Sequence, residues 1–588
     1  MLSEKGEIAL SLSGGGVRAL GYHLGTMDYL NRLGWLERVS ILSSVSGGSL
    51  TAIGYALAKK KQLSFDQFYD QIFEFLPKLN TVEMIFENLA AAKPVAASGR
   101  RDLITCWAEV YRQTYFEPYF GDPSFGIFWS GPKTHLEEVI FNGVELKSGV
   151  AFRFQHSTNT NAFRVGNGNI WLEHEHARML KMSDVMASSS CIPGGMEPLQ
   201  LPEDYRWPDD RWTHKGRISR DTCDAVKKHL ADNFGADAAN VAIVDGGIYD
   251  NQTISSVLLA LSRAHEHRPG NHAQLEQSEP SVHDGAWHDW FGDVVDNYAN
   301  SADHDRLGMY IISDAVVRHD PMFDPDPNNC IPSKETSWLR RRTLGQLNVA
   351  AWIVSIALLT SAAVNFADFF IAGGFSLAGS PKTMIFNVAS SLIPGLVAAL
   401  ILLLLVVGRR SLEKAAKATL SHLPRMTRSF WSLVKGLSLG NLLDMLSVRA
   451  ATLSMLVSRF YMHRTRQLEY SIAYKDERLA DKIVANEIYR LLDAPDDLVV
   501  SPDLRNVVEV GANLPTKIWI NDVGTHADDA KVLHGRNDLQ VLVATGQATI
   551  IANLLQRVGE TDSELRATLQ RDWQLINDDP FHFVDNRP

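Results

Sequence analysis

The first 60 residues alternate between apolar segments and turns rich in glycine. An apolar run at 8–12 is followed by three glycines, a periodic run at 17–33 and a second apolar run at 39–45. In the periodic run, apolar side chains recur at steps of three and four residues, as one face of a helix requires. This order predicts a strand, a turn, a helix and a second strand, and therefore a parallel βαβ unit.

Short apolar runs later in the chain predict further buried strands. They lie at 152–155, 241–244, 310–312 and 517–520, and a longer run at 544–558 predicts a helix. Residues 262–290 lack apolar periodicity and are expected to form a loop or a peripheral insertion. Strands that alternate with helices predict an α/β fold around a mainly parallel sheet.

Two stretches of 24 residues, at 344–367 and 385–408, contain no Asp, Glu, Lys or Arg. At about 1.5 Å per residue, a helix of this length reaches about 36 Å, which is enough to cross a hydrocarbon core of about 30 Å. A soluble helix of that length normally carries a charged face, so a pair of buried core helices is the weaker alternative. The pattern predicts an inserted transmembrane helical hairpin.

Positive charge flanks the predicted hairpin. Three arginines at 340–342 precede it and two at 409–410 follow it, whereas the connection carries only Asp368 and Lys382. By the positive-inside rule, both ends are expected on the cytoplasmic side. Residues 409–469 hold eleven Lys and Arg against three acidic residues, a net charge of +8, with apolar residues between them. They are expected to lie along an anionic membrane surface, or to form ordinary solvated helices beside the spans.

The composition excludes several classes of protein. The chain has 588 residues, of which 45% are hydrophobic, a net charge of −11 and four cysteines. These values exclude collagen, a disulfide scaffold and a fully disordered chain, and the negative charge argues against a nucleic-acid-binding protein. The cysteines form no metal-ligating pair, and the N-terminus does not have the pattern of a signal peptide. We therefore expect an integral membrane protein whose soluble part is cytoplasmic.

The end of the second predicted strand has the layout of a nucleophile elbow. It reads Ser-Ser-Val-Ser-Gly-Gly-Ser and runs into an apolar helix at 50–57. A sharp strand-to-helix turn with small neighbours lifts a serine hydroxyl clear of a sheet. Ser46 is therefore the candidate nucleophile, with Gly47 and Gly48 as its small neighbours. Ser44 stands where the usual motif has its first glycine.

The glycines Gly14, Gly15 and Gly16 lie between the first strand and the first helix. Their N–H groups are at a helix N-terminus and can bind an anion, such as the oxyanion of acyl transfer. Together with Ala19 they also match a dinucleotide fingerprint, which needs an acidic residue at the end of the second strand. That strand ends in serine and glycine instead. A phosphate-binding P-loop is a poorer match, because no Gly-Lys-Ser or Gly-Lys-Thr follows.

Asp245 follows another apolar strand and precedes Gly246 and Gly247. A carboxylate at a strand end, with small neighbours that let a partner approach, can act as a general base. Taken alone, an Asp-Gly-Gly sequence is usually just a turn.

With these three segments, the chain resembles the patatin-like phospholipases, a family of lipid acyl hydrolases. The family has a glycine-rich oxyanion loop followed by an arginine, a serine elbow and an Asp-Gly-Gly or Asp-Gly-Ala base, matched here by Gly14 to Arg18, Ser46 and Asp245 to Gly247. Segments 187–193 and 152–159 are similar to two further family segments. The similarity covers residues 7 to about 315 and, more loosely, 500–558. Because of its hairpin, the chain is identified as a membrane-integral, bacterial-type member.

The resemblance implies a three-layer patatin-like fold and a Ser-Asp dyad that needs no histidine, metal or cofactor. Asp245 would take the proton of Ser46, which attacks an acyl ester of a membrane phospholipid, while Gly14, Gly15 and Gly16 hold the oxyanion. Arg18 would orient this loop or a lipid phosphate. Two alternatives stay open: an acyltransferase that uses the same acyl-enzyme, and a catalytically silent membrane scaffold.

Other candidate residues have plainer explanations. Two His-x-His pairs, at 174–176 and 265–267, lack the spacing of a zinc motif and are expected at the solvated surface. His23, inside the first predicted helix, is expected to be a packed histidine. The aromatic residues of 205–212 are expected to anchor a loop rather than to form a lid.

We therefore expect four parts in the chain. These are a main catalytic part at 1–339, the hairpin at 340–410, basic juxtamembrane helices at 411–475, and a return to the soluble domain with a tail at 476–588. The lipid head group, any activating partner and the oligomeric state are not indicated by the sequence.

Overall fold

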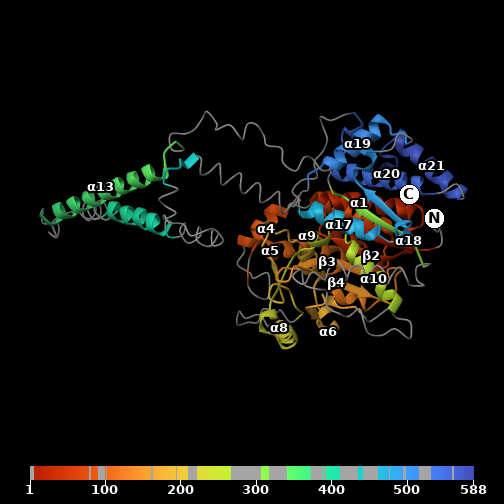
Figure 1. Cartoon of the computed structure of the whole chain (residues 1–588), viewed down its shortest axis with the longest axis horizontal. Coiled ribbons are helices and arrows are strands. Elements are labelled where there is room, and N and C mark those ends of the chain that lie inside the picture. The colour runs from red at the N-terminus through yellow and green to blue at the C-terminus, as the bar shows by residue number, and fades with distance from the viewer. Residues whose placement is uncertain are drawn as a thin grey trace. The chain divides into compact units, whose positions relative to one another are not determined.

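The chain divides into two compact units (Figure 1). The main unit contains Met1–Asp320 and Phe460–Pro588, and the inserted unit is Pro321–Arg459. The computed structural model describes residues 6–78, 81–90, 100, 102–159, 163–193, 195–208, 221–266, 306–316, 341–371, 389, 393–408, 410, 435–440, 461–475, 477–493, 498–515, 531–558 and 562–587.

The main unit is built on one sheet, ten-stranded in the described part of the chain. Five strands run parallel, in the order β10 (Ile483–Glu487), β9 (Leu307–Asp314), β1 (Glu7–Leu12), β2 (Val39–Val45) and β3 (Glu138–Glu145). The others are β4 (Val150–Ser157), β5 (Val165–Gly166), β6 (Trp171–Leu172), β7 (Leu199–Leu201) and β8 (Val241–Asp245). The predicted α/β class and mainly parallel sheet are confirmed.

Strand β3 joins the parallel and antiparallel parts of the sheet. Its first residues, Glu138–Asn142, pair with β2, and its last residues, Gly143–Glu145, pair antiparallel with β8. Strand β4 pairs with β3 over the whole of that length. Because β4 occupies one edge of β3, the strands β2 and β8 meet end to end along the other edge. Strand β3 was not predicted from the sequence.

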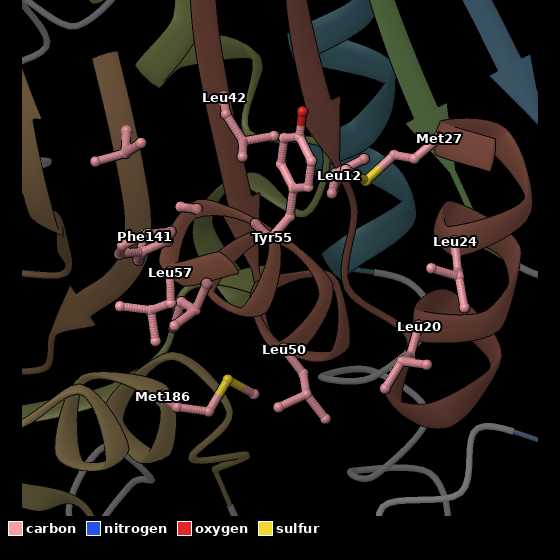
Figure 2. Packing of buried hydrophobic residues seen from close by; sticks show 14 of the residues in the cluster. Leu12, Leu20, Leu24, Met27, Leu42, Leu50, Tyr55, Leu57, Phe141 and Met186 are labelled. Carbon is pink, nitrogen blue, oxygen red and sulfur yellow. The ribbon is translucent and has the colours of Figure 1, made fainter. Parts of the chain in front are cut away.

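Helices cover both faces of the sheet. On β1, Ile8, Leu10 and Leu12 face one hydrophobic cluster and Ala9 faces another, as the two-residue period of a strand requires. The first cluster includes α1 (Gly16–Arg32), α2 (Gly47–Lys60) and α20 (Asp538–Arg557), and the second includes α10 (Ile254–Glu266) and α17 (Met462–Ala473). Figure 2 shows the first cluster between the strands and the helices α1 and α2, with Leu12, Leu42, Leu20, Leu24 and Leu50 labelled. The unit therefore has three layers.

The remaining helices lie around this frame. They are α3 (Phe65–Phe75), α4 (Thr81–Ala90), α5 (Leu103–Tyr111), α6 (His174–Ala177), α7 (Met182–Ser189), α8 (Asp221–Phe234), α9 (Gly247–Asp250), α18 (Glu477–Ala480), α19 (Pro502–Asn513), α21 (Ser563–Asp578) and α22 (His582–Asp585). One of these elements differs from expectation, because α10 extends to Glu266, into the segment that was expected to be a loop or a peripheral insertion.

The C-terminal segment completes the core through α20, which packs along α1 (Figure 1). Asn537 and Gln540 form a capping box at its start, with hydrogen bonds of 2.9 and 3.1 Å. This helix is apolar enough to cross a membrane, but 89% of its apolar window is buried, so it is a core helix. It confirms the helix predicted at 544–558, whereas the strand predicted at 517–520 lies outside the described residues.

The inserted unit contains the predicted hairpin segments. The first is α13 (Leu344–Ile371), whose apolar window at Leu344–Asn365 is 6% buried. Of the second, the structure describes the apolar helix Ile393–Gly408. A Cβ built on Gly395 would lie 3.5 Å from the Cβ of Ala362, so the two helices touch each other. Most of the basic segment at 409–459 lies outside the described residues.

Candidate active site

Ser46 lies in the turn between β2 and α2. Its backbone has φ 52° and ψ −126°, a conformation that L-residues rarely adopt and that costs about 1–3 kcal/mol. Two hydrogen bonds hold the turn, because the Ser46 N–H donates to both the carbonyl oxygen and the Oγ of Ser189 at 3.0 Å. The sharp strand-to-helix turn predicted from the sequence is therefore present at Ser46.

The two glycines after Ser46 let the glycine-rich loop come close. A Cβ on Gly47 would lie 2.1 Å from the carbonyl oxygen of Gly16, and a Cβ on Gly48 would lie 2.5 Å from that of Ser13. Real side chains do not fit at such distances, so both positions require glycine for packing. Gly47 and Gly48 thus allow the turn at Ser46 to pack directly against the glycine-rich loop.

Ser44, the departure from the usual elbow motif, is accommodated by a hydrogen bond. Its Oγ lies 3.1 Å from the Oγ of Ser49, which lies 2.8 Å from the Oγ of Ser189. All three hydroxyls are buried. A serine at this position therefore joins the polar contacts behind Ser46 without a change in the shape of the turn.

Asp245 lies next to Ser46 because β2 and β8 end at the same place along β3. The Ser46 hydroxyl lies close enough to the Asp245 carboxyl to favour its charged form and so lower its pKa. The Asp245 Oδ1 accepts the Gly247 N–H at 2.8 Å, and the Asp245 N–H donates to the carbonyl oxygen of Cys191 at 2.8 Å. A Cβ on Gly246 would lie 2.7 Å from the carbonyl oxygen of Asn142, so this turn also packs on β3.

Burial sets the charge state of Asp245. It raises the pKa of the carboxyl to about 6, while the hydrogen bonds from the Gly247 N–H and from Ser46 favour the carboxylate. At neutral pH the carboxylate form dominates, and its basicity is higher than that of an exposed aspartate. The environment therefore suits proton transfer from a hydroxyl.

The glycine-rich loop lies directly beside Ser46. A Cβ on Gly14 would lie 3.1 Å from the Cβ of Ser46 and 2.4 Å from the Oδ1 of Asn251. The Gly14 N–H donates to the carbonyl oxygen of Asn251 at 3.2 Å, so it is already used. Gly15 and Gly16 have φ of 146° and 60°, and their N–H groups have no acceptor among the described residues. These two N–H groups are thus the loop donors still available to a ligand.

Arg18 and His23, in the first helix, both form hydrogen bonds within the protein. The Arg18 Nε and Nη1 donate to the carbonyl oxygens of Ala315 and Leu514, at 2.9 and 2.7 Å, so Arg18 acts on the protein rather than on a ligand here. His23 is fully buried, with its ring nitrogens 2.8 Å from the Ser13 carbonyl oxygen and the Ser313 Oγ. Burial lowers the pKa of His23 to about 4. It is a packed, neutral histidine, as expected.

Of the aromatic residues at 205–212 and the histidine pairs, those that the structure describes have structural explanations. Tyr205 and Trp207 are buried, with hydrogen bonds to Ser188 and to the Pro202 carbonyl oxygen, as packing anchors should be. His174 is half-buried and stacks on a phenylalanine ring. Trp212 and the 265–267 histidine side chains lie outside the described residues. In the described part of the chain, no group of three or more His, Cys, Asp or Glu could hold a metal ion.

The structure adds Asn142, a residue that the sequence analysis missed. It lies on β3 beside Val45, and its Nδ2 donates to the Ser44 carbonyl oxygen at 2.9 Å and to the Ser43 Oγ at 3.1 Å. Its own carbonyl oxygen accepts the Ser189 hydroxyl at 2.7 Å. A single polar residue after the apolar run Val-Ile-Phe was the available signal, but β3 had not been recognised.

One known family matches the part of the chain that contains the glycine loop, the Ser46 turn and the Asp245 turn. Residues 10–258 match the family model of the patatin-like phospholipases. The matched segment contains the glycine loop, the Ser46 turn and the Asp245 turn, so the three motifs belong to one patatin-like domain. The fold is a patatin fold, with a mostly parallel sheet between layers of helices.

Two further comparisons add little to the patatin-like domain. No curated protein matches the sequence. Among solved structures, human GIVD cytosolic phospholipase A2 aligns with a TM-score of 0.22 and 14% identity, over 32% of this chain and 28% of that chain. The chain therefore spans less than a third of that protein.

The raised pKa of Asp245 predicts a pH dependence for any reaction of the patatin-like domain. A general base works as the carboxylate, so kcat/KM should fall about tenfold per pH unit below the pKa and level off above it. The midpoint is expected near pH 6. Initial rates on a soluble short-chain ester, with circular dichroism at each pH as a check on folding, measure this. A rate that stays constant between about pH 4 and about pH 8 would contradict the assignment.

Proposed function

We propose that the protein is a serine lipid acyl hydrolase of the phospholipase A or esterase type, which cleaves acyl esters of membrane phospholipids. The observation that carries the proposal is that Ser46 and Asp245 lie next to each other, beside two loop N–H groups that have no acceptor among the described residues, within a segment that matches the patatin-like phospholipases. A nucleophile, a base and an oxyanion site are the three components that acyl transfer through an acyl-enzyme needs.

The proposed reaction has two stages. Asp245 takes the proton of the Ser46 hydroxyl while Oγ attacks the ester carbonyl carbon, and the N–H groups of Gly15 and Gly16 bind the oxyanion. The carbon–oxygen bond of the ester then breaks, and the leaving alcohol takes the proton from Asp245. In the second stage water attacks the acyl-enzyme and gives a proton to Asp245, and the fatty acid leaves as Ser46 regains its proton.

The inserted unit supports membrane attachment. Apolar side chains are exposed along both of its described helices, with Ile353 at 62%, Leu396 at 68% and Leu404 at 63%. Exposed apolar surface on this scale marks a contact with lipid or with another protein. The window at Leu344–Asn365 is long enough to span a bilayer. Arginines flank the hairpin at both ends. Because positive charge marks the cytoplasmic side of a membrane protein, we infer that both ends lie on that side.

One experiment tests both parts of the proposal. Membranes that contain the protein are washed with alkaline carbonate, and fatty-acid release from mixed phospholipid vesicles is then measured in the washed membranes. We expect the protein to stay in the membrane pellet and to release free fatty acid. Protein that washes off contradicts the hairpin. Acyl chains that appear on an added lipid alcohol instead of as free acid would identify a transferase, and no acyl turnover together with no labelling by a serine-reactive probe would identify a silent scaffold.

A further inference from the structure

Helix α17 belongs to the main unit, although it directly follows the inserted unit in the sequence. Its Arg466 is buried, and its Nε donates to the Asp314 Oδ2 at 2.8 Å. Asp314 ends β9, the strand after which the chain leaves for the inserted unit. The segments of the main unit that precede and follow the insertion are thus joined by a buried ion pair. Arg466 had been expected in a basic segment along a membrane surface, and this contact accounts for its charge instead.

A second charged residue of α17, Glu469, reaches the vicinity of the active site. It is 6% exposed and interacts electrostatically with Asp250 and Arg153, which are both 3% exposed. Burial, and then the neighbouring Asp250, raise the pKa of Glu469 well above its usual value, whereas Arg153 favours the charged form. Asp250 lies five residues after Asp245, at the end of α9. Arg153, on β4, therefore interacts electrostatically with two acidic side chains, Asp250 and Glu469.

The guanidinium of Arg153 starts a directed series of hydrogen bonds. Its Nε donates to the Ser256 Oγ at 2.8 Å, and the Ser256 hydroxyl donates to the Asn142 Oδ1 at 2.7 Å. An arginine can only donate, so the single hydroxyl proton of Ser256 is free to go to Asn142. This fixes the Asn142 amide with its oxygen toward Ser256 and its Nδ2 toward the end of β2.

The series ends at the nucleophile. Asn142 binds the Ser44 carbonyl oxygen through Nδ2, and its own carbonyl oxygen accepts the Ser189 hydroxyl. The Ser189 Oγ in turn accepts the Ser46 N–H. We call the residues Glu469, Arg153, Ser256, Asn142 and Ser189 the support chain of Ser46. They come from five different elements, α17, β4, α10, β3 and α7.

We propose that the support chain positions Ser46 for attack, and that helix α17 acts on the reaction rate through it. The strained backbone of Ser46 needs partners that fix it, and the support chain fixes both the strand before it and its own N–H. Burial of a charged arginine and two acidic groups costs folding free energy, and apolar residues at these positions would stabilise the fold as well or better. Stability alone therefore does not explain these buried groups. The proposal rests on Ser46 as the nucleophile, and it makes Ser256 and Asn142 positioning residues.

The first test breaks the support chain in its middle. Ser256→Ala removes two hydrogen bonds and leaves the backbone of α10 unchanged. Ser262→Ala is the matched control, because Ser262 is a buried serine of the same helix whose hydroxyl bonds only back to Leu259. We expect Ser256→Ala to lower kcat about tenfold with KM unchanged, and to slow labelling by a serine-reactive probe by the same factor. The Ser262→Ala enzyme should match wild type.

Equal kcat in the two variants, at equal melting temperature, would overturn the proposal. A loss confined to KM would also overturn it, since positioning of the nucleophile acts on the chemical step. Failure of the proposed function is distinguishable, because wild type itself would then neither turn over ester nor label at Ser46.

The second test asks whether α17 acts along the same route. Glu469→Leu is compared with Gln467→Leu, an exposed position of the same helix, and each is combined with Ser256→Ala. If Glu469 acts through Ser256, the double variant should be no slower than the slower single variant, whereas independent effects multiply. Multiplied losses would overturn the role of α17. Glu469→Gln keeps the shape of the side chain and gives the same comparison if the leucine variant does not accumulate.

Discussion

Ser46→Ala is expected to reduce fatty-acid release from phospholipid vesicles by about four orders of magnitude or more, because an alanine cannot form the acyl-enzyme. Asp245→Asn should lose about three orders of magnitude, because the amide can still accept the Gly247 N–H but cannot take a proton. Release rates in washed membranes and labelling by a serine-reactive probe measure both effects. The probe should label wild type and fail on Ser46→Ala.

Ser262→Ala serves as the control for these two variants, since it removes a buried hydroxyl away from the turn. A Ser46→Ala protein that keeps more than a tenth of wild-type activity would show that another group is the nucleophile. Melting temperatures close to that of wild type would confirm that the losses are not due to unfolding.

Gly25→Ala is expected to destabilise the main unit strongly, although alanine is the better helix former. Helix propensity alone would favour the substitution by about 1 kcal/mol. However, a Cβ on Gly25 would lie 2.1 Å from the carbonyl oxygen of Val543 in α20, and neither backbone can give way without parting the helices. Overpacking costs about 1–3 kcal/mol and occasionally more, and a contact of 2.1 Å with a backbone atom belongs to the severe cases, so we expect a clearly lower melting temperature.

Thermal unfolding followed by circular dichroism measures the effect, with two comparisons. Gly546→Ala, from the facing helix, should behave alike, because its Cβ would lie 2.2 Å from the Tyr22 carbonyl oxygen. Gly195→Ala should be close to neutral, since the nearest atom to its Cβ would be at 3.5 Å. If Gly25→Ala raises the melting temperature, propensity outweighs packing and the close contact of α1 with α20 is wrong.

The sequence predicted those parts of the site that are local in the chain. The order of β1, the glycine loop, α1, β2 and the Ser46 turn is contained in consecutive residues, where apolar periodicity and glycine positions are direct signals. Asp245 could be recognised because its strand and its two glycines are also local. Which of the loop N–H groups are available could not be predicted, because the Gly14 N–H is bound by Asn251, more than 200 positions away.

The parts that were missed depend on contacts between distant segments. Strand β3 reads Glu-Val-Ile-Phe-Asn-Gly-Val-Glu, with polar residues at both ends and in its middle, because it makes hydrogen bonds and ion pairs inside the protein. Arg153 looked like an ordinary charge between two phenylalanines. Likewise, the charges of α17 looked like part of a basic juxtamembrane segment, whereas Arg466 and Glu469 are buried and Arg466 forms an ion pair with the distant Asp314.

The insertion lies in the connection between two neighbouring strands, where the length of the chain can change at little cost. Strands β9 and β10 are parallel neighbours, and the chain between them holds the whole inserted unit and then α17. In α/β proteins such neighbours are normally joined by one short crossover helix. The inserted unit is thus an enlarged crossover connection, and each doubling of a connection's length costs only about 0.6 kcal/mol. The inserted unit could therefore be lengthened, replaced or removed at this one junction while the strand order of the sheet stays the same.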